Sequence, residues 1–443
     1  MIAVRLWWRL LRRQDAQRLT ILLALIAFGT ATGALLTVLG GLHAFTERGG
    51  NELYVMLAQV ATVILVIPVF TLGGAAARLS ISRRDERLAA LRLAGATSGQ
   101  VSVIAIIDAA AQALAGAIFG VALYLVALPG VAMINFQGRP FAWSELWVGP
   151  LILVGAVAAV VLLAAISATI SLAKIVVSPL GVARRSSPAK VTWVRIVVGV
   201  AVLAVWIPLM QSFSGLAGLL VIMAVFAACF AVLNLIGPFI LALIGKLSAR
   251  RANTVPRLLA ARRLIDDPKS AWRTVAGVTL ATFVASVLSI APAIADLQSD
   301  ADQANQGDLK YLPIDLMTGA IVTLVIAALL AAVSSGVNQA ARVYDQRDQY
   351  RMLHLAGTDI SILERARLRE TWLPLISSVV IAAIVALIMV APFGLMLITL
   401  SKLGPIMFLG GMVVSLAMVM GAVRLSQPLV ARVTLSERAV RAD

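Results

Sequence analysis

The sequence predicts an all-α polytopic membrane protein of ten transmembrane helices, arranged as two parallel four-helix repeats joined by a two-helix connector (4+2+4). Three observations predict this class. The 443 residues are 61% hydrophobic and only 13% charged, with a mean hydropathy of +0.97, whereas a soluble domain has about 25% charged residues. Apolar runs of about 20 residues, the length that crosses a bilayer, recur along the chain. A polar motif occurs twice, 262 positions apart.

Ten apolar runs are long enough to form membrane-spanning helices. Gly237-Pro238 falls inside the sixth run, where proline is expected to kink the helix or to end it early. The ten predicted spans are Leu19–Gly41, Leu53–Ala77, Val101–Leu128, Gly149–Ala173, Trp193–Met210, Gly215–Ile244, Arg273–Ala295, Leu312–Ala341, Thr371–Thr399 and Met407–Leu425.

Basic residues gather on one side of this topology. With the N-terminus in the cytoplasm, 33 of the 37 Lys and Arg residues lie in or beside inner segments. Only Arg48, Arg139, Lys310 and Lys402 lie in outer segments. This distribution follows the positive-inside rule, so the net charge of +16 is explained without a nucleic-acid partner. We expect a multi-pass protein of a bacterial plasma membrane with both termini in the cytoplasm.

The first 18 residues, MIAVRLWWRLLRRQDAQR, predict an amphipathic interfacial helix rather than a signal peptide. Leucine and tryptophan form one face of this helix and arginine the other, the pattern of helices that lie on a bilayer and contact membrane lipid. No small-residue cleavage site follows a short apolar core, as a signal peptide requires.

Internal repetition predicts the domain organisation. Shifting Arg83–Asp108 by 262 positions aligns it with Asp345–Glu370 without a gap. Because four plus two spans is an even number, both repeats begin on the same side of the membrane and are parallel. The predicted regions are the interfacial helix (1–18), a first four-helix repeat (19–190), a connector (191–247) and a second repeat with a cytoplasmic tail (248–443).

Each repeat carries a polar corner between its second and third spans. The first reads LRLAGAT (91–97) and the second LHLAGTD (353–359). Gly95 is a natural helix end, and Thr97-Ser-Gly-Gln100 has the form of a capping box that starts the next helix. In the second copy Asp359 takes the N-cap position. The sequence therefore predicts a sharp helix–turn–helix below the bilayer at each corner.

The corner resembles a known family. Glu86, followed by Leu91-Arg92 and Gly95, is similar to the signature of the FtsX-like (MacB-type) ABC transporter permeases, as are the four-helix unit and the Ser-Pro-Leu at 178–180. In that family the corner is a coupling helix that docks on an ATPase subunit. The resemblance implies two sets of ATPase-coupling residues: Arg84, Glu86, Arg87, Leu91, Arg92 and Gly95 in the first corner, and Asp348, Leu353, His354 and Gly357 in the second.

The second corner departs from the family pattern, since Asp348 replaces Glu and His354 replaces Arg. We therefore expect two ATPase subunits per chain, bound unequally. The ten-helix form resembles the permeases of peptide-antibiotic detoxification systems, but the longest outer segments, at about 129–148 and 296–311, have roughly 20 residues or fewer. A large outer domain of the kind that such relatives carry is not expected.

No catalytic motif is present. Gly245-Lys246 is followed by Leu247, so the phosphate-binding P-loop is missing. The chain is not expected to be an enzyme or to hold a cofactor, and ATP and Mg²⁺ would be bound by the partner ATPase. His43 and His354 are predicted on opposite sides and Cys229 lies mid-membrane, so no metal site is expected.

Three functions remain open. The first is the permease of an ATP-driven pump that exports or extracts an antimicrobial peptide, a lipophilic drug or a lipid, and so confers antimicrobial resistance. The second is a relay that regulates an extracellular enzyme or a sensor kinase, which would need an outer docking surface. The third is a secondary transporter that works without ATP.

Two further features have two interpretations each. Asp108 and Glu370 both lie 13 residues beyond the corner glycine on largely apolar helices, where a carboxylate is costly. They form either a proton or cation site or, more simply, pairs with nearby basic residues. The aromatic segment Phe136–Trp147 is either a rim that receives an amphiphile or an interfacial belt.

Overall fold

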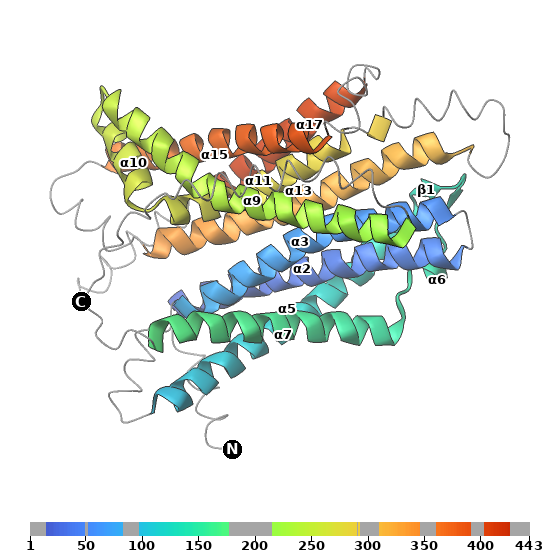
Figure 1. The fold of residues 1–443 in the computed structure, drawn as a ribbon. Coiled ribbons are helices and arrows are strands. Elements are labelled where there is room, and N and C mark those ends of the chain that lie inside the picture. The colour runs from blue at the N-terminus through green and yellow to red at the C-terminus, as the bar shows by residue number, and fades with distance from the viewer. Residues whose placement is uncertain are drawn as a thin grey trace. The chain divides into compact units, whose positions relative to one another are not determined.

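The computed structural model describes residues 15–48, 52–82, 97–176, 215–289, 291–292, 310–345, 360–390 and 403–425. These residues are almost entirely helical (Figure 1). The long helices are α2 (Asp15–Glu47), α3 (Glu52–Ser82), α5 (Ser98–Ala132), α7 (Gly149–Val176), α9 (Gly215–Arg250), α11 (Pro268–Leu288), α13 (Leu312–Asp345), α15 (Ile360–Val390) and α17 (Leu403–Leu425). The short elements are α6 (Trp143–Leu146), α10 (Val255–Asp266) and the strands β1 (Asn135–Phe136) and β2 (Arg139–Pro140).

Seven helices in the described part of the chain are long and apolar enough to cross a bilayer, namely α2, α3, α5, α7, α9, α11 and α13. Shorter apolar stretches occur at Trp372–Ile388 and Gly404–Val414. The protein is therefore an all-α polytopic membrane protein, as the composition predicts. The fifth predicted span, Trp193–Met210, and nearly all of the predicted interfacial helix at 1–18 lie outside the described residues.

The chain divides into two compact units. Unit 1 comprises residues 1–37, 69–129 and 148–181, and unit 2 comprises residues 38–68, 130–147 and 182–443. Helices pack through different contacts in the two units. The sequence-predicted boundaries after residues 18, 190 and 247 stay a prediction.

In unit 1, α2 and α5 approach closely through glycines. Gly29 and Gly33 of α2 meet Gly116 and Gly120 of α5, so that a Cβ added to Gly120 would lie 2.5 Å from the Gly29 carbonyl oxygen and 3.0 Å from the Gly33 nitrogen. Both pairs have the G-x-x-x-G spacing that lets membrane helices bring their backbones together. A side chain of any size at these positions would push the helices apart.

In unit 2, α11 is the central helix. It packs against α9, α13, α15 and α17 (Figure 1), and 13 of its 21 residues are buried. Three of its four buried hydroxyls donate to carbonyls of the same helix. Thr279 donates a hydrogen bond to the Val275 carbonyl at 2.9 Å and Ser286 to the Thr282 carbonyl at 2.7 Å. The fourth, the hydroxyl of Thr282, has no hydrogen-bond partner within the described residues, whereas most buried polar groups in proteins are bonded.

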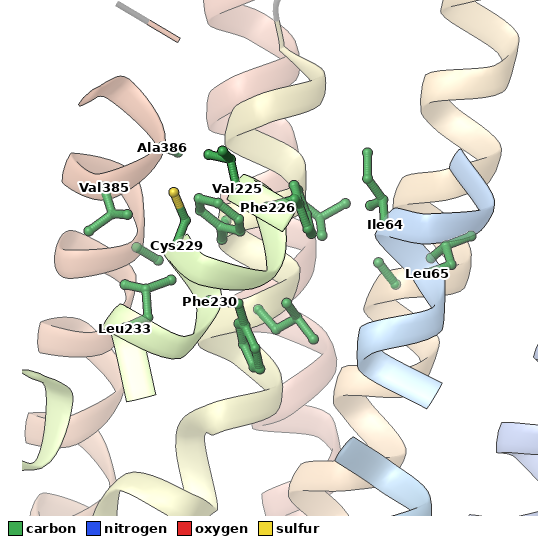
Figure 2. Close-up of a cluster of buried hydrophobic side chains, with 14 residues drawn as sticks. Ile64, Leu65, Val225, Phe226, Cys229, Phe230, Leu233, Val385 and Ala386 are labelled. Atoms are coloured by element: carbon green, nitrogen blue, oxygen red, sulfur yellow. The ribbon is translucent and has the colours of Figure 1, made fainter. Parts of the chain in front are cut away.

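A large apolar cluster of unit 2 forms between α9 and its neighbours (Figure 2). Phe226 of α9 lies against Phe283 of α11, with ring centroids 5.0 Å apart. Cys229 is fully buried one turn further along α9. Ile64 of α3 and Val385 of α15 complete the cluster on two other sides.

Helix α9 continues through Gly237-Pro238 to Arg250, so of the two expectations an early end is wrong and a kink stays a prediction. The Trp272 indole packs on this stretch, and a Cβ at Gly237 would lie 2.3 Å from the ring. The indole Nε1 also donates to the Asn234 Oδ1 at 3.1 Å. The glycine therefore accommodates a neighbouring tryptophan rather than a break in the helix.

Candidate functional site

The predicted ATPase-coupling residues lie outside the described residues. This holds for Arg84, Glu86, Arg87, Leu91, Arg92 and Gly95 in the first corner and for Asp348, Leu353, His354 and Gly357 in the second. What the structure describes is the helices that lead into and out of each corner.

The helix that leaves the first corner begins as predicted. The Thr97 amide donates to Gln100 Oε1 at 3.0 Å, and the Gln100 amide donates to Thr97 Oγ1 at 3.3 Å. These reciprocal bonds are the predicted capping box, which is confirmed. In the second repeat α15 begins at Ile360, directly after Asp359 and 262 positions beyond the start of α5 at Ser98.

The helices that enter the corners are longer than a bilayer requires. Helix α3 has 31 residues and α13 has 34, which at 1.5 Å per residue makes them about 46 and 51 Å long. The hydrocarbon core is only about 30 Å thick. Each helix therefore has a length of more than 15 Å outside the hydrocarbon core.

The structure describes the side chain of only one of the two corresponding carboxylates, Asp108 and Glu370. Asp108 of α5 is buried, with 9% of its surface exposed, and it is not without a partner. Glu370 lies on α15, and its side chain is outside the described part. Both the cation-site and the paired-carboxylate interpretation stay hypotheses.

The most organised polar site among the described residues belongs to unit 2. It joins the end of α2, the start of α3, the 135–147 segment and the start of α13, and Figure 1 shows β1 and α6 beside the ends of α2 and α3. We call it the Arg48 cluster. Its members are Phe45, Arg48, Tyr54, Phe136, Gln137, Phe141, Glu145 and Asp315.

Arg48 lies at the centre of this cluster, with only 1% of its side chain exposed. Its Nε and Nη2 donate to Glu145 Oε2 at 3.0 and 2.8 Å. Nη1 donates to the Phe136 carbonyl and Nη2 to the Pro140 carbonyl, each at 2.8 Å. The guanidinium also lies 4.2 Å from the centroid of the Phe141 ring. A buried guanidinium needs such a set of acceptors to offset its lost hydration.

Glu145 has both of its oxygens engaged. Besides Arg48, its Oε2 accepts from the Ala142 amide at 3.0 Å, which caps the short helix α6. Its Oε1 lies 3.2 Å from Arg139 Nη2, whose side chain is 60% exposed. The carboxylate is therefore held by one buried and one exposed arginine, two of the four cations that the sequence places in outer segments.

The two strands are joined by a tight hairpin. Asn135 pairs with Pro140 and Phe136 with Arg139, which leaves Gln137 and Gly138 as the loop. Both have positive φ, 55° and 75°, as a type I′ turn requires. Glycine adopts this conformation freely, but glutamine does so only with support.

That support comes from Asp315 of α13. Its Oδ2 accepts from the Gln137 amide at 2.8 Å and from the Tyr54 hydroxyl at 2.7 Å. The carboxylate is buried, with 5% of the residue exposed. Tyr54 is the third residue of α3 and Asp315 the fourth of α13, so the starts of these two helices lie together.

Aromatic side chains of the 136–147 segment fall into two sets. Phe136 and Phe141 are buried and make edge contacts with Phe45 at 5.3 and 5.5 Å between ring centroids. Trp143 and Trp147 are 64% and 41% exposed. The buried pair is neither a rim nor a belt, whereas the exposed tryptophans still fit either interpretation.

Sequence reasoning missed this cluster because its residues are far apart along the chain. Two signals were available. Gly138 is the second residue of the pair Gln137-Gly138, and a two-residue loop with glycine at this position is typical of a hairpin. Arg48 is one of very few outer cations. Neither signal identifies Asp315, which comes from a helix 261 positions beyond Tyr54.

Comparison with protein families, with curated proteins and with solved structures finds no match for this chain. The geometry itself therefore decides what the site can do. Among the described residues no three His, Cys, Asp or Glu side chains are grouped so that they could hold a metal ion. The Arg48 cluster fixes helix ends relative to one another.

Proposed function

We propose that the chain is the permease subunit of an ATP-driven ABC transporter that exports or extracts a hydrophobic or amphiphilic compound. The observation that carries the proposal is the repeated corner. Long helices lead into both corners, and the helices that leave them begin 262 positions apart at Ser98 and Ile360. The capping box at Thr97 supports a sharp turn at the first corner.

Two parallel repeats in a ten-helix 4+2+4 arrangement are part of the proposal. The hydrogen bond between Tyr54 and Asp315 supports them, because it brings together the starts of α3 and α13, the second helix of each repeat. Shifting Tyr54 by 262 positions gives Leu316, the neighbour of Asp315. Inverted repeats would place these two helix starts on opposite sides of the membrane.

The proposed energy source is a separate ATPase, which binds ATP and Mg²⁺. Arg84, Glu86, Arg87, Leu91, Arg92 and Gly95 dock on one ATPase subunit. Asp348, Leu353, His354 and Gly357 dock on a second. Stiff helices beyond the bilayer pass movement from these contacts into the membrane.

The proposed substrate is an antimicrobial peptide, a lipophilic drug or a lipid that enters from the bilayer. Residues 133–148, within the outer segment predicted at about 129–148, fold into a hairpin and one short helix and are too few to enclose a ligand. An amphiphile that is already dissolved in lipid needs no such enclosure. The expected location is a bacterial plasma membrane, with both termini in the cytoplasm.

Binding of a candidate ABC ATPase, sought first in the gene next to this one, tests the proposal. The full chain is purified in lipid nanodiscs and its affinity for that ATPase is measured, together with ATP hydrolysis. Reversing two charges in the first corner, Arg84→Glu with Arg92→Glu, should weaken binding about 100-fold, because like charges would meet across the interface.

A matched control changes the same charge on the other predicted side, Lys310→Glu with Lys402→Glu, and should bind normally. The corresponding change in the second corner, His354→Glu, should have a smaller effect than the first pair. Normal binding after disruption of both corners contradicts the assignment of these corners as the coupling site.

A relay is the second candidate, and one observation favours it. The hairpin segment exposes Met133, Trp143 and Trp147 at 81%, 64% and 41%, which gives the chain an ordered apolar surface at its predicted outer end. Such a surface suits a partner such as a sensor kinase or an extracellular enzyme. Transport of a labelled amphiphile by proteoliposomes that contain only the permease and the ATPase decides in favour of the pump.

A further inference from the structure

The end of α9 and the helix α10 form a surface to which the proposed function assigns no role. The apolar span of α9 ends at Arg250. A short turn then leads into α10, which packs against α9 and α15. The sequence here, GKLSARRANTVPRLLAARRLID, combines leucines with many cations. All of it belongs to unit 2.

Five cations of this surface are exposed. They are Lys246, Arg250, Arg251, Arg257 and Arg262. Within the described residues none of the five forms an ion pair with a carboxylate. The acidic residues nearest in sequence are Asp266 and Asp267, and Asp267 accepts from the Ser270 amide at 3.1 Å to cap α11.

Helix α10 has an inner and an outer face. Ala260, Ala261 and Leu264 are fully buried on the inner face. Val255 and Leu258, at i and i+3, are 64% and 43% exposed on the outer face. Arg262 follows at i+7 on the same side. The outer face therefore carries two aliphatic side chains followed by a cation.

The last turns of α9 repeat this combination. Leu243 and Leu247, four residues apart, are 46% and 47% exposed. Lys246 and Arg250, also four apart, are exposed beside them. Because Leu243 lies inside the apolar span, this surface extends from the hydrocarbon edge toward water.

We propose that the α9–α10 surface binds anionic phospholipid. Arginine and lysine donate to the lipid phosphates, while Leu243, Leu247, Val255 and Leu258 contact the acyl chains. An amphipathic helix that is basic and apolar on one side is typical of a membrane interface. An acidic protein partner could neutralise the cations, but it would not cover a leucine within the span.

Lipid selectivity of the full-length protein tests this inference. The chain in detergent is mixed with phosphatidylglycerol or phosphatidylcholine of identical acyl chains, and bound lipids are counted by native mass spectrometry. Phosphatidylglycerol should bind more tightly. Arg257→Gln with Arg262→Gln should reduce that preference about 30-fold, since each of the two cations near an anionic surface contributes about 1 kcal/mol.

The matched control is Arg139→Gln with Lys310→Gln, which removes two exposed cations elsewhere and should leave the preference within about twofold. Excess inorganic phosphate should fail to displace the lipid, because it lacks acyl chains. Equal binding of the two lipids by the wild-type chain overturns the proposal, as does an unchanged preference in Arg257→Gln with Arg262→Gln. Displacement by phosphate would instead identify a simple anion site.

A second measurement distinguishes lipid from a protein partner. A nitroxide is attached to Leu258→Cys, and native Cys229, fully buried, should not react. In bilayers the label should collide more often with molecular oxygen than with a water-soluble nickel chelate. More frequent collisions with the chelate place Leu258 in water and contradict the proposal. Protection from both reagents, if it appears only with the ATPase present, indicates a protein contact instead.

Discussion

Helix α2 makes two kinds of contact that hold helices together in opposite ways. In unit 1, Gly29 and Gly33 let α5 approach backbone to backbone. In unit 2, Arg48 follows directly after the last residue of α2 and binds two carbonyls and a carboxylate. The first contact depends on the absence of side chains. The second depends on one long, charged side chain that is completely buried.

The difference reflects the surrounding medium. Inside a bilayer, lipid tails are as apolar as the helices, so helices associate through close packing and small residues. At the predicted outer end of the bundle, water competes for every polar group, and a buried cation persists only where enough acceptors replace water. Substitutions in the two regions should therefore fail for different reasons.

The largest effect is expected from Arg48→Met. This change leaves Glu145 without its buried partner and frees the Phe136 and Pro140 carbonyls. Breaking a buried pair in this way should lower the free energy of unfolding by about 3–5 kcal/mol. The measurement is denaturation by sodium dodecyl sulfate in mixed micelles.

Arg139→Gln is the control for this prediction, because it removes the exposed arginine from the same carboxylate. It should cost less than about 1 kcal/mol. If the two arginine variants are equally stable, burial of Arg48 is not what gives the cluster its strength.

A somewhat smaller effect is expected from Gly120→Ala in α5. The new Cβ would meet the Gly29 carbonyl oxygen at 2.5 Å and the Thr32 Cβ at 2.6 Å, and a backbone atom cannot move aside as a flexible side chain can. The cost should be about 3 kcal/mol, at the upper end for overpacking, measured by the same denaturation.

Gly130→Ala tests whether glycine itself matters, since this residue of α5 has nothing within 4 Å of an added Cβ. It should be neutral or slightly stabilising, because alanine favours a helix. A comparable loss of stability in both variants would show that α5 needs glycine for flexibility rather than for close packing.

Of the three destabilising substitutions, Tyr54→Phe should have the smallest effect. Only the hydroxyl is removed, and Asp315 keeps its bond from the Gln137 amide. Loss of one hydrogen bond to a carboxylate should cost about 2 kcal/mol. In addition, the start of α3 should exchange its amide hydrogens faster while α5 is unaffected. Unchanged exchange would mean that the bond does not hold α3 to α13.

Most of the fold was predictable because membrane spans leave a strong local signal. Nine of the ten predicted runs correspond to helices in the described part of the chain, and α5 begins with the capping box that Thr97 and Gln100 encode. What local patterns could not show was long-range packing. Gly237-Pro238 predicts a kink or an early end of α9, and the sequence does not reveal that Trp272 occupies the space beside Gly237.

The Arg48 cluster was harder to predict than any helix. Arg48 was counted as one of four outer cations, and Phe136 was assigned with Trp143 to one aromatic segment. Neither assignment identifies Asp315 as a member of the cluster. Asp315 stands among the apolar residues at the start of α13, where its spacing from Tyr54 follows from no periodicity. Contacts between segments so far apart are determined by the assembled bundle.

The Tyr54–Asp315 bond also has a consequence for biogenesis. The ribosome adds 261 residues between the two partners, which takes about 13–52 s at 5–20 residues per second. Glu145 is synthesised 97 residues after Arg48, so the interval between these two partners is shorter. The chain therefore inserts α2 and α3 well before the polar contacts at their ends exist. The bond to Asp315 forms only after α13 has been synthesised, which makes it a late step that α2 and α3 cannot complete on their own.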